Sequence, residues 1–530
     1  MTIRPDPRAR FFIKPTRLVA KEDARLAQAL LEETEEVCQL PPGAWILLDF
    51  GRELHGGVRL DVPTTTPNGS PLVRVRFGES VSEAMGLPDQ DHAIHDHRVP
   101  VAWMGRTEVG ETGFRFVRID NVDPGITIQL RSVEAVHLIR PEPWQGSFEC
   151  SDPRLNQIWQ TGAYTVHLCM QDHVWDGIKR DRLVWIGDLH PEAMVIATVF
   201  GDHPIVRESL DSVRDRTPLP QWMNGISSYS LWWLLIHADW YARFGDLGYL
   251  MQQRSYLKGL LEQILRCIRP DGGEFLDGHR FLEWPTSGDP DAIAAGLQAL
   301  VVRTLQRGTQ LCRVLGEQEL AARCELVVER ARRAERPTVS KQAHALKVLA
   351  GMSNPDLANR NVFSVRPDRG LSTFYGYYVL EARAQAGDFT GCLELIRSYW
   401  GGMLDLGATT FWEGFELDWA HNATRIDELP VRGRPDIHAD FGDWCYKGLR
   451  HSLCHGWAAG PTAWLTDWVL GLRAAEPGMG KLHCQPHLGE LDWARGTLPT
   501  PHGLVRVEHQ RSTDGTVQTR LTLPEGISRA

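Results

Sequence analysis

The spacing of apolar residues changes twice along the chain. Between about residues 44 and 142, apolar and polar positions alternate in short runs separated by Gly, Pro and Asn, which is typical of β-strands. Runs 45–50, 57–62 and 72–77 are clear examples. Many short strands at such intervals predict a β-sandwich. We interpret the preceding segment, 21–38, as a helix.

After about residue 150 the apolar period lengthens to that of amphipathic helices. Leu257, Leu260, Leu261 and Ile264, for example, fall on one helical face. Either Ser151 or Asp152 can cap the first helix. The expected helical segments include 155–170, 190–200, 204–215, 228–244, 247–268, 291–315, 340–351, 374–386, 389–405 and 456–472. About a dozen helices in antiparallel pairs predict a closed (α/α)6 barrel, whereas an open solenoid would show a fixed repeat that this chain lacks.

Strand-like alternation returns from about residue 476, for example in 503–508 and 517–523. A chain of 530 residues is also too long for one ordinary domain. We therefore predict a multidomain α and β protein, a six-hairpin (α/α)6 barrel flanked by two β domains. The expected ranges are 1–145 for the N-terminal β-sandwich, 146–472 for the catalytic barrel and 473–530 for a small C-terminal β domain.

The composition of the chain restricts its possible binding partners and its expected cellular compartment. A net charge of −10 argues against a nucleic-acid-binding surface. The N-terminal stretch 1–15 has no apolar run typical of a secretory signal, and no window predicts a membrane span. The ten cysteines are scattered through apolar segments, as expected of reduced thiols in the cytoplasm. The oligomeric state is left open, with a homodimer as one option.

Tryptophan is unusually abundant. Of 19 tryptophans, 15 lie between Trp159 and Trp468. Core packing explains most single tryptophans. A group of them beside carboxylates also suits a small carbohydrate, because pyranose C–H faces stack on aromatic rings and hydroxyls bond to Asp and Glu.

Four clusters combine such residues at the ends of expected helices. They are the polar loop 175–192, 407–416 with Glu413, 452–457 with His455, and 281–286 with Trp284. Taken alone, each cluster has a purely structural interpretation. In the same order, these are a group of structural salt bridges, an exposed acid, a structural histidine and an aromatic residue that anchors a loop. An (α/α)6 barrel brings such ends to one mouth, and paired acids there indicate glycosidic cleavage.

The polar loop carries a family motif. The inverting α-L-rhamnosidases of glycoside hydrolase family 78 have Asp-Cys-Pro-x-Arg-Glu-Arg-x-Gly-Trp-x-Gly-Asp. This chain matches it without a gap at Asp176, Arg180, Arg182, Trp185, Gly187 and Asp188. Segments 48–52, 76–79, 146–153, 494–496 and 499–503 resemble other parts of that family, so the resemblance covers nearly the whole chain.

The resemblance implies roles for individual residues. Asp176 and Asp188 would hold sugar hydroxyls, and Trp185 would pack against the ring. Glu413, in Ala-Thr-Thr-Phe-Trp-Glu, resembles the general base, and His455, in Ser-Leu-Cys-His, resembles a histidine of the sugar site. The further predicted substrate-binding residues are Arg180, Trp284, Trp412 and Trp457. No cofactor and no metal are implied.

One departure concerns the general acid. The family has Glu where this chain has Asp181, which is one methylene shorter. A misplacement of about 1 Å can cost about 10²-fold in rate. Gly177 and Ile178 replace the family's Cys-Pro, and a shifted loop is expected to compensate, because Asp176, Arg180 and Asp188 remain.

The segment 91–97 places His95 and His97 on one face of an expected strand, where a metal site is conceivable. We interpret it as a polar surface turn away from the four clusters.

The predicted function is an exo-acting inverting glycoside hydrolase that releases terminal α-L-rhamnose, or a closely similar sugar, from small glycosides or oligosaccharides. Alternatives are another six-hairpin carbohydrate-active enzyme, such as the unsaturated glucuronyl hydrolase type or a phosphorolytic enzyme, and a non-catalytic rhamnoside-binding protein. No Gly-rich phosphate loop supports the phosphorolytic alternative.

Overall fold

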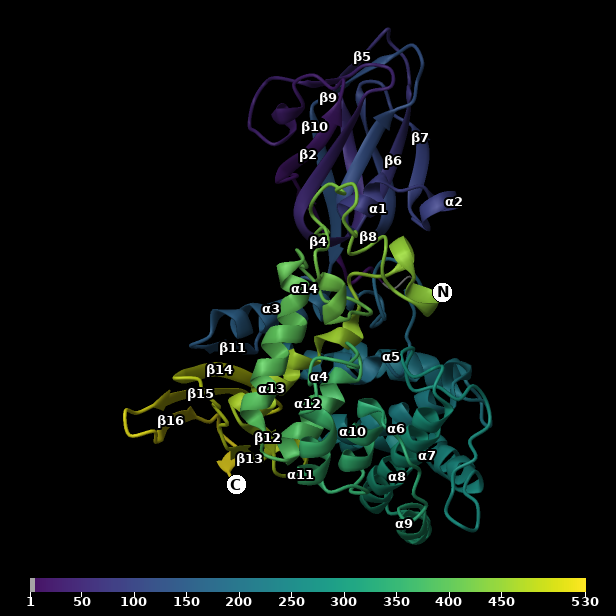
Figure 1. Cartoon of the computed structure of the whole chain (residues 1–530), viewed down its shortest axis with the longest axis vertical. Coiled ribbons are helices and arrows are strands. Elements are labelled where there is room, and N and C mark those ends of the chain that lie inside the picture. The colour runs from purple at the N-terminus through teal and green to yellow at the C-terminus, as the bar shows by residue number, and fades with distance from the viewer. Residues whose placement is uncertain (1–4) are drawn as a thin grey trace.

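The computed structural model describes residues 5–530, apart from the side chains of Asp91 and Cys445. Residues 1–4, which begin the stretch that we predict not to be a secretory signal, lie outside the described residues. A β-sandwich is stacked on a helical body, and a small sheet lies beside the helices (Figure 1). Within residues 5–530, no helix has the length and apolar character that a membrane crossing requires.

Two antiparallel sheets form the N-terminal β-sandwich. Its strands are β1 (Ala9–Ile13), β2 (Arg17–Glu22), β3 (Cys38–Leu40), β4 (Trp45–Val62), β5 (Thr64–Thr66), β6 (Leu72–Gly78), β7 (Asp96–Pro100), β8 (Gly105–Asn121), β9 (Thr127–Leu130) and β10 (Ser132–Ile139). The larger sheet has the order β1-β10-β4-β8-β6-β7, with β2 also paired to β4, and the smaller has β3-β9-β5. Ile46, Leu48 and Phe50 are buried between the sheets, as the alternation predicts.

The long central pair β4 and β8 reaches the helical body. Its register is interrupted between Asp49 and Leu54. At this interruption the Glu53 amide donates to Thr409 Oγ1 at 2.9 Å, and Arg115 of β8 donates to the Gly407 carbonyl at 2.9 Å. The end of the sheet therefore contacts the loop that carries Glu413.

The helix expected over 21–38 is wrong. Strand β2 ends at Glu22, a short 3₁₀ turn, η1 (Ala27–Leu30), follows, and β3 begins at Cys38. Asp23 and Leu26 both have left-handed backbone angles, which interrupt a helix. The acidic run after η1 provides no apolar face, so pairing of the flanking strands decides the structure.

Six inner helices form a closed ring. They are α4 (Leu189–Val199), α6 (Ser227–Phe244), α8 (Pro290–Val314), α10 (Lys341–Leu349), α12 (Gly376–Gln385) and α15 (Gly460–Trp464), the last extended by η8 (Gly456–Ala459) and η9 (Leu465–Val469). Each contacts the next, and α15 contacts α4 to complete the ring. This closure confirms the (α/α)6 barrel.

Outer helices alternate with the inner ones along the chain. They are α3 (Pro153–Cys169), α5 (Pro204–Arg216), α7 (Leu247–Arg266), α9 (Gln318–Ala331), α11 (Pro355–Ala358) with η3 (Asn359–Phe363), and α13 (Phe389–Leu395) with η4 (Ile396–Trp400) and α14 (Gly401–Asp405). Asp152 is the cap of α3, since its carboxylate accepts from the Arg154 amide at 2.8 Å. Gly245 ends α6 in the left-handed conformation, as its position predicts.

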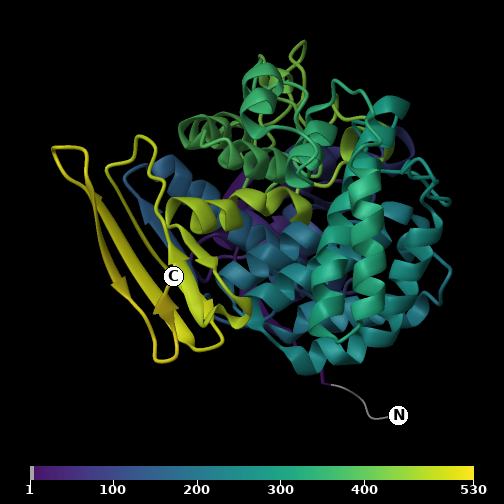
Figure 2. The same ribbon diagram turned by 90° about the horizontal axis from the view of Figure 1, so that it is seen from below.

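The C-terminal sheets lie against one side of the helices (Figure 2). Their strands are β11 (Ser147–Cys150), β12 (Leu472–Ala474), β13 (Lys481–Cys484), β14 (Trp493–Thr500), β15 (Gly503–Arg511), β16 (Val517–Thr522) and β17 (Ser528–Arg529). One sheet has the order β11-β14-β15-β16 and the other β12-β13-β17. Strand β11, which precedes the helical body in sequence, thus pairs with β14, which follows it.

A buried ionic cluster joins the sandwich to the loop 175–188. Lys179 Nζ lies 3.1 Å from Glu79 Oε2 and 3.2 Å from Glu83 Oε1, and all three side chains are fully buried. Glu79 follows β6, and Glu83 lies in the short helix α1 (Val81–Met85). Burial works against charge on Lys179, but the two carboxylates outweigh it and raise its pKa. The lysine also donates to the Leu449 carbonyl at 3.1 Å.

Replacing Lys179 by Met should destabilise the protein strongly, because Glu79 and Glu83 would remain buried without their cation. Removal of one partner of a buried ion pair costs about 3–5 kcal/mol. Urea unfolding followed by tryptophan fluorescence measures the loss. The exposed Lys14→Met is the control, and Lys179→Met combined with Glu79→Gln and Glu83→Gln should recover part of the loss. Equal stability of Lys179→Met and wild type would contradict the role of this cluster.

Candidate functional site

The loop between α3 and α4 closes on itself and on the last inner helix. The Leu183 amide donates to Asp176 Oδ1, and the Asp176 amide donates to the Leu183 carbonyl, both at 3.0 Å. The Gly456 amide donates to the Asp176 carbonyl at 2.8 Å. Asp181, at the turn of this loop, has a left-handed backbone with φ 56°. Burial and backbone hydrogen bonds thus fix the conformation of the loop and the position of Asp181.

One guanidinium connects the two predicted catalytic carboxylates. Arg180 Nη1 lies 3.3 Å from Asp181 Oδ2, and Nη2 donates to Glu413 Oε2. Glu413 is buried, whereas the Asp181 side chain is 34% exposed. Burial favours the neutral form of Glu413, but Arg180 and the nearby His455 outweigh it and lower its pKa. Glu413 is therefore ionised near neutral pH, as a general base must be.

The backbone around Glu413 is fixed by several hydrogen bonds. Its carbonyl accepts from Thr373 Oγ1 at 2.6 Å and from Trp457 Nε1 at 2.9 Å. Its amide donates to the Ser452 carbonyl at 3.0 Å. Since no regular element holds this loop, these contacts determine where the carboxylate lies.

Asp188, His455 and Tyr229 form a buried network. Asp188 Oδ1 accepts from the Tyr229 hydroxyl at 2.9 Å, and Oδ2 lies 3.1 Å from His455 Nε2. Burial lowers the pKa of His455, but the carboxylates of Glu413, Asp188 and Asp176 overcome this effect and raise it to about 9. His455 is thus cationic near neutral pH, whereas burial still raises the pKa values of Asp176 and Asp188 beside it. A Cβ on Gly187 would lie 2.3 Å from the Tyr229 ring, so only glycine fits there.

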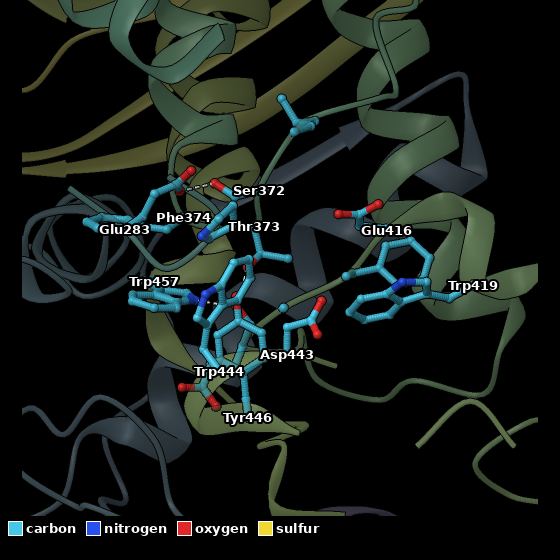
Figure 3. Close-up of a pocket in the computed structure, with 15 residues that line it drawn as sticks. Glu283, Ser372, Thr373, Phe374, Glu416, Trp419, Asp443, Trp444, Tyr446 and Trp457 are labelled. Carbon is cyan, nitrogen blue, oxygen red and sulfur yellow. Dashed lines mark hydrogen bonds between the residues drawn. The ribbon is translucent and has the colours of Figure 1, made fainter. Parts of the chain in front are cut away.

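A cavity opens beside Glu413 and encloses about 410 Å³ of empty space, solvent at its mouth included. Figure 3 shows Glu283 and Ser372 on one wall and Glu416 and Trp419 on the opposite wall. The lining residues include Glu283, Phe374, Glu413, Trp419, Asp443, Trp444, Tyr446 and Trp457. Aromatic rings with interspersed carboxyl groups can hold a small polar ring with hydroxyls.

Family models match two parts of the chain. Residues 143–336 match the bacterial alpha-L-rhamnosidase 6 hairpin glycosidase domain, and residues 471–529 match the bacterial alpha-L-rhamnosidase C-terminal domain. An alpha-L-rhamnosidase of Alteromonas sp. (strain LOR) is 23% identical over 549 residues, 91% of this chain and 55% of the relative. Both models describe domains of bacterial α-L-rhamnosidases, so these two parts of the chain are similar to that family. The resemblance that the loop motif indicates is thus confirmed.

Solved rhamnosidases share the fold of this chain. A family 78 rhamnosidase of Bacillus sp. GL1 superposes with a TM-score of 0.76 at 23% identity, over 94% of this chain and 56% of that one. A rhamnosidase from Klebsiella oxytoca with rhamnose bound gives 0.72 at 20% identity, over 87% of this chain and 96% of that one. The chain spans about half the length of the Alteromonas and Bacillus relatives.

The predicted site residues fall into two groups. Glu413 and Trp457 line the cavity. Asp176, Arg180, Asp181, Asp188 and His455 are outside the cavity lining, in the charged and hydrogen-bonded networks around Glu413.

Three predicted tryptophans lie outside the cavity lining. Trp185 packs edge-on against Tyr229, with ring centroids 6.0 Å apart, and Trp284 packs against Phe281 at 5.1 Å. Trp412 is fully buried and contacts Phe415. Trp185 therefore supports the hydrogen-bond network of Asp188 by packing against Tyr229. Trp284 and Trp412 pack behind the residues that line the cavity.

The sequence missed Glu283, which lines the cavity next to the predicted Trp284. Burial raises the pKa of Glu283 to about 8, and its Oε2 accepts from the Ser372 hydroxyl. Its Oε1 is buried without a hydrogen-bond partner. A protonated carboxyl group here can donate a hydrogen bond to a sugar oxygen. An acid beside an aromatic residue in the sequence was the available signal, but it did not show which of the two faces inward.

The histidine segment 91–97 is not remote from the site, contrary to our interpretation. His95 Nε2 lies 3.0 Å from the Lys179 carbonyl, and burial lowers the pKa of His95 to about 4. Strand β7 follows the edge of the sandwich that meets the loop 175–188. Among the described residues, no group of three or more His, Cys, Asp or Glu side chains is arranged to hold a metal ion.

Replacing Glu283 by Gln should change how stability depends on pH. The folded-state pKa of about 8 lies above the ordinary 4.5, so the stability that protonated Glu283 contributes is complete below pH 4.5 and is lost as the pH rises toward 8. Gln does not ionise. The melting temperature of Glu283→Gln relative to wild type should therefore rise between pH 5 and 8 and then level off. Differential scanning fluorimetry measures it, with the exposed Glu394→Gln as control; a difference that stays constant with pH would contradict the raised pKa.

Proposed function

We propose that this chain is an exo-acting inverting glycoside hydrolase that releases terminal α-L-rhamnose, or a closely similar sugar, from small glycosides or oligosaccharides. The observation that supports it most is the ionised Glu413 at the wall of an aromatic cavity, joined through Arg180 to a second carboxylate. The Alteromonas relative is an alpha-L-rhamnosidase, and rhamnose is bound in the Klebsiella oxytoca structure.

In the proposed reaction Glu413 takes a proton from water. The water oxygen attacks the anomeric carbon while the bond to the leaving oxygen breaks, and Asp181 gives that oxygen its proton. The two carboxyl groups lie on opposite arms of the Arg180 fork, which separates them and is compatible with a water molecule between base and sugar. Inversion of an α-rhamnoside then yields β-rhamnose first.

Asp176, Asp188 and His455 would hold sugar hydroxyls, and Trp457 would stack on the ring. His455 is cationic near neutral pH because of its acidic neighbours, so it donates hydrogen bonds. Phe374 stacks on Trp457 with the ring planes 6° apart and the centroids 4.9 Å apart, which fixes the indole as a flat platform. The predicted cytoplasmic location stays a prediction, for which the burial of the nine described free cysteines is the support. The oligomeric state also stays open.

The substitutions Glu413→Gln and Asp181→Asn should each lower kcat, by about 10²–10⁴-fold, because each removes a proton-transfer group. The two should differ in their leaving-group dependence. Asp181→Asn should spare 4-nitrophenyl α-L-rhamnoside, whose leaving group needs little protonation, more than an alkyl rhamnoside. Glu413→Gln should impair both substrates alike.

The exposed Asp215→Asn is the matched control and should keep full activity on both substrates. NMR of the first product should show the β-anomer. Full activity of Asp181→Asn on the alkyl glycoside would remove Asp181 from its role, and an α-anomer as first product would exclude inversion.

A non-catalytic binding protein is the second candidate, because Asp181 is a methylene shorter than the family's acid and partly exposed. The Asp181→Glu variant tests this point. If the loop compensates for the shorter side chain, as we propose, Asp181→Glu gains no activity over wild type. A gain of about 10²-fold would show that Asp181 is misplaced by about 1 Å, and calorimetric rhamnose binding without turnover in wild type would establish the binding protein.

A further inference from the structure

A second cavity lies inside the ring of inner helices, deeper along the barrel than the candidate site. Together with the solvent at its mouth it comprises about 670 Å³ of empty space, and its lining includes Asp239 and Arg243 of α6, Arg303 of α8, Glu381 of α12, Asp467 of η9 and Arg473. Along α6, Tyr229 belongs to the candidate site and Asp239 to this cavity. Tyr229 and Asp239 are ten positions apart on this helix, which corresponds to a rise of about 15 Å along its axis.

A layer of aromatic rings divides the two cavities. Trp232 stacks on Tyr378 with centroids 4.8 Å apart, and Tyr375 packs edge-on against Tyr378 at 5.1 Å. Tyr378 also reaches into the deeper cavity, where its hydroxyl lies 2.9 Å from His190 Nδ1. The deeper cavity is therefore a separate compartment with its own lining.

Two guanidinium groups that line this cavity, those of Arg303 and Arg473, form no salt bridge among the described residues, although Asp239, Glu381 and Asp467 attract them at longer range. Among the described residues, Arg303 forms no hydrogen bond or ion pair, and its Nε is buried without a partner. Arg473 Nε is also buried without a partner, and its guanidinium lies 4.0 Å from the centre of the Trp468 ring. Both residues are only partly buried, and a guanidinium that is not held in a salt bridge can bind an incoming anion.

The remaining charges are already compensated. Arg243 pairs with Asp467, and Arg307 pairs with Asp239 at 2.6 Å. Burial raises the pKa of Glu381 to about 7, so it carries only part of a negative charge, and its Oε1 accepts from Trp468 Nε1 at 2.9 Å. Among the described residues that line the cavity, Arg303 and Arg473 are thus the two arginines that are not held in a salt bridge.

We infer that this cavity binds a small hydroxylated anion, of the class of sugar acids and sugar phosphates. Arg303 and Arg473 would bind the carboxylate or phosphate, since a guanidinium matches the geometry of both. Asp467 Oδ1, which is buried without a hydrogen-bond partner, would accept from a hydroxyl, as would Glu381. The inference does not depend on the proposed hydrolase activity.

Isothermal titration of the full chain with D-glucuronate and with D-glucose 6-phosphate, at constant ionic strength, tests it. At least one should bind, and D-glucose, which lacks the oxyanion, should bind at least tenfold more weakly. Arg303→Gln and Arg473→Gln should each weaken binding about tenfold or more. Arg313→Gln, exposed on the same helix as Arg303, is the matched control and should change nothing.

A second readout is the stability without ligand. Because Arg303 forms no hydrogen bond or salt bridge among the described residues, Arg303→Gln should leave the melting temperature in dilute buffer nearly unchanged and should remove the stabilisation that the anion provides. A lower melting temperature would show that Arg303 is structural, and absence of binding by both anions would overturn the inference. Equal binding by wild type and Arg303→Gln would place the anion elsewhere and overturn it too.

Discussion

Two consecutive basic residues, Lys179 and Arg180, determine how the parts of this protein meet. Lys179 is buried between Glu79 and Glu83 of the sandwich, and Arg180 turns the other way to Glu413 of the helical body. A side chain that leaves water with a charge must find its partners in exact positions. The loop between α3 and α4 can satisfy both residues only when the sandwich and the barrel mouth are in place. The sandwich therefore fixes the loop that carries Arg180 and Asp181, although the cavity itself is lined by residues of the helical body.

The charges around Glu413 form an alternating arrangement. Arg180 and His455 lie beside Glu413, and Asp188 lies beyond His455 and is tied in turn to Tyr229. Arg180 and His455 lower the pKa of Glu413 although burial raises it. The arrangement thus keeps this one carboxylate ionised next to aromatic walls. The same logic, with the anion missing, distinguishes Arg303 and Arg473 in the deeper cavity.

Much of this architecture could be predicted from the sequence, because helical and strand periods are local properties. The prediction of a helix over 21–38 was wrong because the structure of this segment depends on the strands beside it. The loop motif located Arg180, Asp181 and Asp188 because consecutive spacing is preserved in one turn. The sequence could not show that Glu283 rather than Trp284 faces the cavity, since in an irregular loop neighbouring side chains follow no fixed period. Nor could it show that His95 lies against Lys179, 84 residues away in sequence.

Strands β11 and β14 have a consequence for how the chain can be divided. Cys150 pairs with Ala494, so the first residues before the helical body are hydrogen-bonded to the segment beyond its end. The pairing of β11 with β14 thus holds the two ends of the helical body together. A fragment that begins at α3 and keeps the C-terminal sheet would lack β11, and so would expose one edge of β14 and leave α3 without the strand that leads into it. Exposed edges of this kind recruit strands from other molecules. A minimal fragment that contains the barrel therefore has to include β11 and the C-terminal sheet as well.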